Sequence, residues 1–275
     1  MTRESVLSQP QFDNSSHPCF ISGVSLKLAK LGDGPEIFHT IQGEGVSAGM
    51  PAVFIRASRC NLHCVWCDTD HTWNFEGTPW PHEKDIVPGY AKHRKADVTF
   101  ETTPAEAARR IVPFACPRVV ITGGEPLLQD EEFLEMIHLI RSEMPDCVFE
   151  VETNATRVPS PTFAEAVDQF NVSPKLANAG MPESLRLNDE ALRFFAASPK
   201  AWFKFVIASP ADLAEIKMLQ TRYEIPRERI LLMPEGRTAA ELDRTAPQLA
   251  DLCRELGFRF CDRLHIRLWG DRRGV

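Results

Sequence analysis

Three cysteines, Cys60, Cys64 and Cys67, stand close together in the stretch RCNLHCVWCDT. Thiolates at these spacings can converge from one loop on a single soft metal centre. A structural zinc ion needs four ligands, and His63 and His71 are the nearest candidates for the fourth. An iron–sulfur cluster held by only three thiolates instead leaves one iron open to a substrate or cofactor. The spacing favours the cluster, with zinc and unliganded loop thiols as the alternatives.

A second stretch whose residues could bind a ligand is ITGGEPLLQ, which follows a β-rich segment. Gly123 and Gly124 allow the backbone to turn tightly and to approach a ligand, and Glu125 adds a negative charge. Taken alone, the stretch is also consistent with an ordinary turn whose glutamate suits a helix N-terminus. Because it comes one strand after the three cysteines, we interpret it as a binding loop.

Polar residues also end the next two β-rich segments. Glu152 and Asn154 occur in VETNAT, and Ser173 and Lys175 occur in NVSPK. The ends of successive parallel strands meet at one mouth of a sheet, so these side chains are expected to converge there. Each is also an ordinary polar residue at a strand end, and we hold both interpretations open.

The composition limits the classes of partner and location. The chain has 275 residues, a net charge of −7 and 43% hydrophobic residues. The negative charge disfavours nucleic-acid binding, and no long apolar run predicts a membrane span or a signal peptide. Eight cysteines are too few and too scattered for a secreted disulfide framework. We expect a cytoplasmic protein that binds a small molecule or another protein, with Cys116, Cys147, Cys253 and Cys261 in the core.

The elements that would position these residues alternate along the chain. Expected strands at 52–58, 118–122, 147–153, 169–173, 202–207, 229–234 and 258–269 alternate with expected helices at 102–115, 130–144, 188–198, 210–223 and 238–257. This alternation predicts an α/β fold, a partial, open (β/α) barrel of about six mostly parallel strands. Residues 1–22 are expected to form a flexible tail. Residues 23–275 are expected to form one domain with an insertion at about 70–98.

The spacing C-x3-C-x2-C, with Trp66 before the last cysteine, resembles the radical S-adenosylmethionine (SAM) enzymes. The resemblance implies a [4Fe–4S] cluster on Cys60, Cys64 and Cys67. It also implies that SAM binds the open iron and is cleaved to a 5′-deoxyadenosyl radical. By the same resemblance, SAM is bound by Gly123, Gly124, Glu125, Glu152, Asn154, Ser173 and Lys175.

Two further stretches, FHTIQGEG before the cysteines and LHIRLWG near the C-terminus, resemble the 7-carboxy-7-deazaguanine synthase family of 7-deazapurine (queuosine-type) biosynthesis. The resemblance implies that Gln42 and Glu44 face a pterin and that Arg56 pairs with the substrate carboxylate. The remaining implied contacts are the hydroxyl of Thr69 to Mg²⁺, Thr122 and Gly124 to pterin or SAM, and His265 with Val275 to close the pocket.

The reaction implied by this family is the ring contraction of 6-carboxy-5,6,7,8-tetrahydropterin to 7-carboxy-7-deazaguanine with loss of ammonia. SAM would be regenerated in each turnover, and Mg²⁺ would hold the substrate carboxylate. A homodimer and an electron donor such as flavodoxin are also expected from the resemblance. For the insertion at about 70–98, a cover over the cluster, a docking site for the donor and an ordinary surface loop all remain open.

Two rival functions differ in features that can be tested. A radical SAM activase that installs a glycyl radical in a partner protein would share the cysteines but has no use for TIQGEG or a carboxylate-binding Arg56. A non-enzymatic zinc-binding adaptor would need a fourth ligand and would purify colourless. An iron–sulfur protein would instead be brown.

Overall fold

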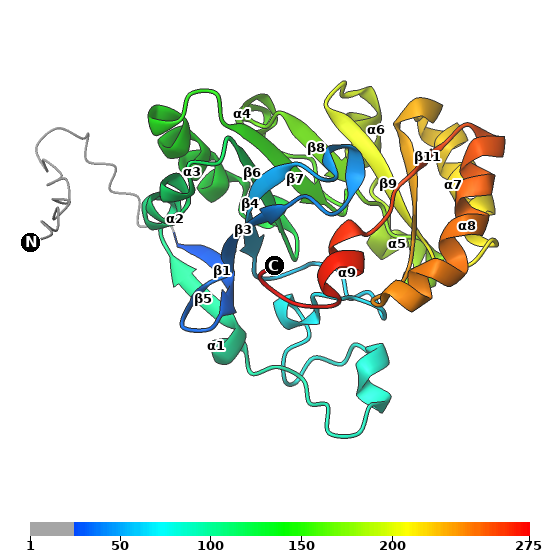
Figure 1. Ribbon diagram of the computed structural model, residues 1–275, viewed down its shortest axis with the longest axis horizontal. Helices are drawn as coiled ribbons and strands as arrows, with labels where there is room; N and C mark the ends of the chain where they lie inside the picture. Colours follow the sequence, from blue (N-terminus) through cyan, green and yellow to red (C-terminus); the bar gives the residue numbers. More distant parts are fainter. Residues whose placement is uncertain (1–24) are drawn as a thin grey trace, which may run out of the picture.

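The computed structural model describes residues 25–275. These residues form one large sheet and the helices that pack against it (Figure 1). The expected tail at 1–22 lies outside the described residues. The parallel part of the sheet follows the order β4 (Pro51–Ala57), β6 (Arg118–Gly123), β7 (Val148–Thr153), β8 (Gln169–Val172), β9 (Ala201–Ile207), β10 (Ile230–Pro234) and β11 (Arg259–Phe260). Within residues 25–275 the sheet path ends at β11 on one side and at β2 on the other. The predicted open, mostly parallel α/β barrel is therefore confirmed.

The longer helices begin where their sequences supply caps. Thr103 accepts a hydrogen bond from the Glu106 amide at 3.2 Å and begins α2 (Pro104–Ile111). Thr238 and Glu241 form a reciprocal capping box at the start of α8 (Ala239–Leu256). The other predicted helices are present as α3 (Asp130–Glu143), α6 (Asp189–Ala197) and α7 (Asp212–Tyr223). The short α4 (Pro161–Ala166) and α5 (Glu183–Arg186) were not predicted.

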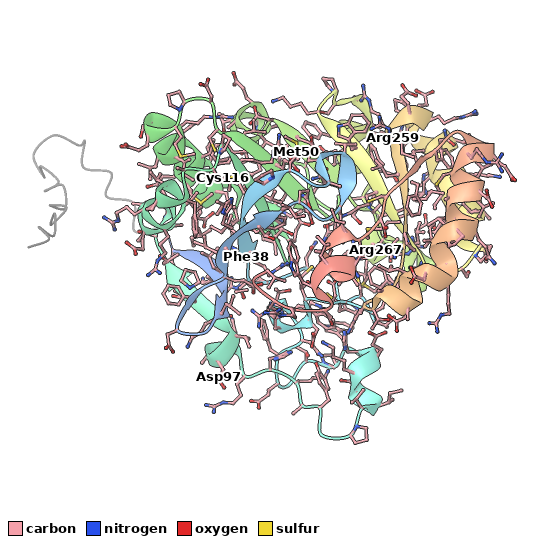
Figure 2. The ribbon with its side chains drawn as sticks, in the orientation of Figure 1. Phe38, Met50, Asp97, Cys116, Arg259 and Arg267 are labelled. Carbon is pink, nitrogen blue, oxygen red and sulfur yellow. The ribbon has the colours of Figure 1, made fainter. Side chains whose placement is uncertain are left out.

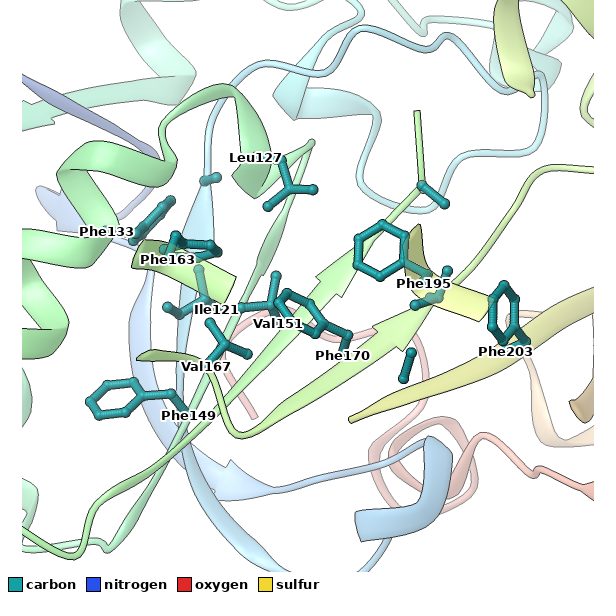
Figure 3. Packing of buried hydrophobic residues seen from close by; sticks show 14 of the residues in the cluster. Ile121, Leu127, Phe133, Phe149, Val151, Phe163, Val167, Phe170, Phe195 and Phe203 are labelled. Carbon is teal, nitrogen blue, oxygen red and sulfur yellow. The ribbon is translucent and has the colours of Figure 1, made fainter. Parts of the chain in front are cut away.

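The core lies between the sheet and these outer helices. Ile121, Val151 and Phe170 are neighbours on successive strands and are buried. They pack in one cluster with Phe133 of α3 and Phe195 of α6 (Figure 3). Because strand side chains alternate between faces, the residues beside them in sequence point into the barrel. The packing of the core therefore fixes which polar side chains reach the interior.

The N-terminal part of the sheet was not predicted. Strands β1 (Leu26–Leu31), β2 (Gly34–Pro35), β3 (Ile37–Ile41) and β5 (Thr99–Thr102) pair antiparallel. The stretch TIQGEG accordingly begins at the end of the edge strand β3, with Thr40 and Ile41 in the strand. These strands are short, and their pairing with β4 and with one another supplies a stabilisation that a single segment does not reveal.

The predicted strand at 258–269 is wrong. Only Arg259–Phe260 pairs with β10, and residues Leu264–Trp269 form the helix α9. The chain leaves the sheet because the Arg263 side chain turns inward to bind carboxylates, and the Leu264 amide bonds to the Gly43 carbonyl at 2.9 Å. His265 thus lies on a helix. Figure 1 shows α9 on the same side of the sheet as the cyan insertion.

The insertion is built around a buried carboxylate. Asp70 accepts hydrogen bonds from Lys84 at 2.7 Å, from the Tyr90 hydroxyl at 2.6 Å and from His93 at 2.9 Å. The regular elements here are η2 (Asp70–Thr72), η3 (Glu83–Ile86) and α1 (Lys95–Val98). These contacts give the segment a compact structure of its own.

No helix among residues 25–275 is long and apolar enough to cross a membrane.

Candidate active site

A cavity of about 250 Å³ opens at the carboxyl ends of the parallel strands. It is the place where the sequence predicted polar side chains to converge. All of the predicted site residues except Glu125 line it, namely Gln42, Glu44, Arg56, Cys60, Cys64, Cys67, Thr69, Thr122, Gly123, Gly124, Glu152, Asn154, Ser173, Lys175, His265 and Val275.

The three clustered cysteines are free thiols in the loop that follows β4. The Cys60 sulfur lies 3.8 Å from the Asn154 side-chain nitrogen, and the Cys67 amide bonds to the Cys64 carbonyl at 3.1 Å. Burial raises the pKa of Cys64 to about 12, so a cation is needed to hold it as a thiolate near neutral pH. Three thiols on one loop around a shared cavity fit a cluster that keeps one iron open.

The other described cysteines lie elsewhere. Cys116, Cys147, Cys253 and Cys261 are all buried, as predicted. Cys116 lies with the green helices in Figure 2, away from the cyan insertion. Cys261 accepts a hydrogen bond from the Gly45 amide at 3.0 Å and so contacts the stretch TIQGEG. The clustered and scattered cysteines therefore differ in environment as well as in spacing.

The glycine loop after β6 packs directly on the cysteine loop. The Gly124 amide bonds to the Ala57 carbonyl at 3.0 Å, and the Glu125 amide bonds to the Arg59 carbonyl at 2.9 Å. A Cβ atom on Gly124 would overlap the Arg59 carbonyl. Glycine is thus required here because two backbones meet, in addition to any approach by a ligand.

Glu125 is buried behind the cavity wall. Its carboxylate accepts hydrogen bonds from the Leu127 amide at 3.0 Å, the Thr153 hydroxyl at 2.8 Å and the Asn154 amide at 2.7 Å. Burial, only partly offset by these bonds, raises the pKa of this carboxyl group. Glu125 therefore joins the ends of β6 and β7, and its oxygens are already committed to protein donors.

The polar residues at the ends of β7 and β8 form short local networks. The Lys175 ammonium donates to the Ser173 hydroxyl at 3.0 Å and lies 5.8 Å from the Trp66 ring centre. Glu152 accepts hydrogen bonds from Thr122 at 3.2 Å and from Gln42 at 3.3 Å. The wall therefore presents a cation on one side and a carboxylate on the other.

Glu44 is held by a group of cations. It pairs with Lys204 of β9, and it accepts a hydrogen bond from the Arg263 Nε at 2.9 Å. The His265 ring lies 3.9 Å from the same carboxylate. Burial opposes ionisation of Glu44, but Lys204 and Arg263 outweigh it and hold the pKa well below its usual range. Glu44 therefore remains an ionised acceptor.

Lys204 and Arg263 were missed by the sequence analysis. Lys204 stands inside the apolar run AWFKFVI, and a charged residue there is itself a sign of an inward-facing functional group. Arg263 stood in the wrongly predicted strand, which concealed its role. Its guanidinium bonds to Asp68 at 2.5 Å and to the Gly236 carbonyl at 2.7 Å, in addition to Glu44.

A second buried carboxylate, Glu36, was also missed. It accepts a hydrogen bond from the Arg56 Nε at 2.8 Å, lies 3.3 Å from the His71 Nε2 and pairs with Arg273. Glu36 has no exposed surface. One side chain thus joins β4, the insertion and the C-terminal segment around the cavity.

Thr69 lies beside the last cysteine of the cluster loop. Its hydroxyl is 3.5 Å from the Cys67 sulfur, and its carbonyl accepts hydrogen bonds from the Thr72 amide and hydroxyl. Among residues 25–275, no three His, Cys, Asp or Glu side chains are gathered around one point as ligands of a single metal ion would be. A hydroxyl facing a cavity nevertheless suits an ion such as Mg²⁺, which prefers oxygen ligands and keeps several waters.

Comparison with known proteins places this site in a family. Residues 54–179 match the Radical SAM superfamily. The chain is 35% identical over 239 residues to the 7-carboxy-7-deazaguanine synthase of Pyrobaculum aerophilum, covering 87% of this chain and 95% of that one. It is 35% identical over 267 residues to the synthase of Halobacterium salinarum, covering 87% and 93% of the two chains.

The fold has a relative of known structure. The crystal structure of QueE from Escherichia coli matches with a TM-score of 0.62 and 24% sequence identity, covering 88% of this chain and 95% of that one. This similarity supports the open barrel, and the relatives of higher identity support the function. The chain therefore belongs to the 7-carboxy-7-deazaguanine synthase family of radical SAM enzymes.

Proposed function

We propose that the protein contracts 6-carboxy-5,6,7,8-tetrahydropterin to 7-carboxy-7-deazaguanine and ammonia, with SAM used catalytically and Mg²⁺ on the substrate carboxylate. The observation that carries this proposal is the ionised Glu44, which faces the same cavity as the three cysteines and Arg56. The cavity therefore combines an acceptor for a pterin edge, a cation for a carboxylate and ligands for a cluster.

Recognition of the pterin falls to Glu44 and Gln42. An ionised carboxylate only accepts hydrogen bonds, which suits the amino group and ring N–H of a pterin. Lys204 and Arg263 fix the position of this carboxylate before substrate arrives, so little ordering is needed on binding. The Gln42 side chain is held by Glu152 at 3.3 Å, and its oxygen accepts the Glu44 amide at 3.2 Å.

Recognition of the substrate carboxylate falls to Arg56. Its Nε is bonded to Glu36, and its two terminal nitrogens form no hydrogen bond with any of residues 25–275. A guanidinium presented in this way can bind a carboxylate. Thr69 would offer its hydroxyl to a Mg²⁺ that also takes the substrate carboxylate, a hard ion on oxygen ligands. His265 and Val275 would close this side of the pocket.

Cys60, Cys64 and Cys67 would hold the cluster, and Gly124, Asn154, Ser173 and Lys175 would hold SAM beside it. When bound, the cluster and SAM supply the one-electron chemistry that removes a hydrogen atom from the substrate. The contribution of the protein is to orient the pterin against SAM and to exclude water from the cavity. We further propose that the enzyme acts in the cytoplasm as a homodimer with a protein electron donor such as flavodoxin, as the family resemblance suggests.

The test is an anaerobic assay with reconstituted cluster, dithionite, SAM, Mg²⁺ and 6-carboxy-5,6,7,8-tetrahydropterin, followed by mass spectrometry. We expect 7-carboxy-7-deazaguanine to accumulate with many turnovers per SAM. Thr69→Ala should weaken the dependence on Mg²⁺, and Glu44→Ala should weaken pterin binding. If 5′-deoxyadenosine accumulates without the deazapurine, the substrate is wrong and an activase or another radical SAM function is favoured.

A further inference from the structure

The insertion closes directly onto the cysteine loop. The Glu83 amide bonds to the Val65 carbonyl at 2.8 Å, so insertion and cysteine loop are joined through their backbones. The His82 ring nitrogen lies 2.9 Å from the Cys67 carbonyl. The insertion therefore contacts the peptide group of a cysteine that we assign to the cluster.

A second residue, 170 positions away in the chain from Cys67, reaches the same peptide. Arg237, in the loop after β10, donates from one terminal nitrogen to the Trp66 and Cys67 carbonyls at 3.0 Å each. The same nitrogen lies 2.5 Å from the Glu83 carboxylate. The Arg237 side chain is 16% exposed, against 45% for Glu83. A mostly buried positive charge is thus fixed at the cysteine loop, with a more exposed negative charge behind it.

Charges in this position affect a cluster in a defined direction. Reduction adds an electron, so a nearby fixed positive charge stabilises the reduced form and a negative charge opposes it. Hydrogen bonds and charges around ligating residues also fix the orientation of those ligands. Arg237 and Glu83 would therefore shift the reduction potential of a cluster on this loop in opposite directions without ligating iron.

We propose that Arg237 and Glu83 are positioning residues that set the reduction potential of the cluster and hold the Cys67 peptide in place. By this proposal the insertion, through Glu83, influences the reduction potential of the cluster. The inference rests on the cluster assignment in the proposed function but is independent of the pterin. It assigns a role to a segment whose sequence left three interpretations open.

The experiment measures the midpoint potential of the reconstituted cluster by titration monitored with electron paramagnetic resonance, without pterin. The variants are Arg237→Gln and Glu83→Gln. The control is Arg244→Gln, which removes an exposed positive charge from α8. We expect the potential to become more negative in Arg237→Gln, more positive in Glu83→Gln and to change least in the control. Arg237→Lys, which keeps the charge, should restore most of the potential.

Two further results decide the inference. Hydrogen exchange of peptides covering residues 60–69 in the metal-free protein should be faster in Arg237→Gln than in the Arg244→Gln control. If Arg237→Gln fails to retain iron, the proposal is tested by the direction of the shift in midpoint potential in Glu83→Gln alone. Potentials that match the wild type in both variants, or that shift in the same direction in both, would overturn the proposal. If the variants show these shifts but the wild-type protein forms no deazapurine, this inference stands and the proposed substrate is wrong.

Discussion

Glu36 holds the Arg56 guanidinium through its Nε at 2.8 Å, and the carboxylate that does so has no contact with solvent. Arg56 is the residue that we assign to the substrate carboxylate, so its orientation depends on a group that the substrate need not touch. The same carboxylate binds His71 and Arg273. If Arg56 binds the substrate carboxylate as proposed, one buried charge would link substrate recognition to the insertion and to the C-terminal segment.

Glu36→Gln should weaken both the fold and substrate binding. Removing one partner of a buried ionic network leaves cations without compensation and costs about 3 kcal/mol. We expect the free energy of unfolding, measured with urea, to fall by that order and the KM for the pterin to rise more than kcat falls. Glu101→Gln, on the exposed face of β5, is the matched control. Equal stability and equal KM in the two variants would contradict the role assigned to Glu36.

The pH dependence of stability should also report on Glu36. Burial opposes its ionisation, but Arg56, His71 and Arg273 together hold its folded pKa well below the ordinary value of 4.5. Because the folded pKa lies below the unfolded one, ionised Glu36 stabilises the fold above about pH 4.5, and this contribution is lost as the pH falls below that value. Urea unfolding between about pH 3 and 7 should show a steeper loss for the wild type than for Glu36→Gln. If the free energy of unfolding of the wild type and of Glu36→Gln fell equally with decreasing pH, Glu36 would not have the lowered pKa assigned to it.

The chemistry of the site was predicted from sequence where it is encoded in short continuous stretches. Cys60, Cys64 and Cys67 depend on spacing within one loop, and Thr122 was expected from the family resemblance of the motif that begins beside it. The core strands were also predicted, because each is an apolar run buried on both faces. These features depend on neighbours in the chain and need no knowledge of distant partners.

The missed features depend on partners far away in the chain. Arg263 is bonded to Glu44 across 219 residues, and a local pattern carries no sign of that pair. The same ion pairs turn the Arg263 side chain inward. Residues Leu264–Trp269 then form the helix α9 and do not continue the strand that was predicted at 258–269. Glu125 shows the opposite case, since its motif was recognised but its carboxylate bonds to the protein and lies outside the cavity lining.

Replacing any one of the clustered cysteines by serine should abolish stable cluster binding. A hydroxyl is a poor ligand for iron compared with a thiolate, so the loss of one of the three proposed cysteine ligands would leave the cluster poorly held. We expect almost complete loss of iron and of the brown absorption after reconstitution of Cys64→Ser. Cys116→Ser is the control, because that thiol is buried in the core among α2 and α3 and lies outside the cavity lining. Retention of a full iron content by Cys64→Ser would overturn the assignment of this loop.

Lys204→Met tests how Glu44 is prepared for the pterin. The methionine keeps an apolar stem of similar length but removes the ammonium group, leaving Glu44 with Arg263 and the more distant His265. The loss of one charge-assisted hydrogen bond is worth about 1.5 kcal/mol, which corresponds to roughly a tenfold rise in the KM for the pterin. Iron content should not change, since among residues 25–275 no hydrogen bond or ion pair joins the β9 lysine to Cys60, Cys64 or Cys67.

A double substitution separates this role from a general loss of structure. If Lys204 acts through Glu44, the effects of Lys204→Met and Glu44→Gln on KM should not add, because the second change removes the carboxylate that the first leaves less constrained. Lys217→Met, at an exposed position on α7, controls for the loss of a lysine. Additive effects in the double variant would show that Lys204 acts independently of Glu44, for example by contacting the substrate itself.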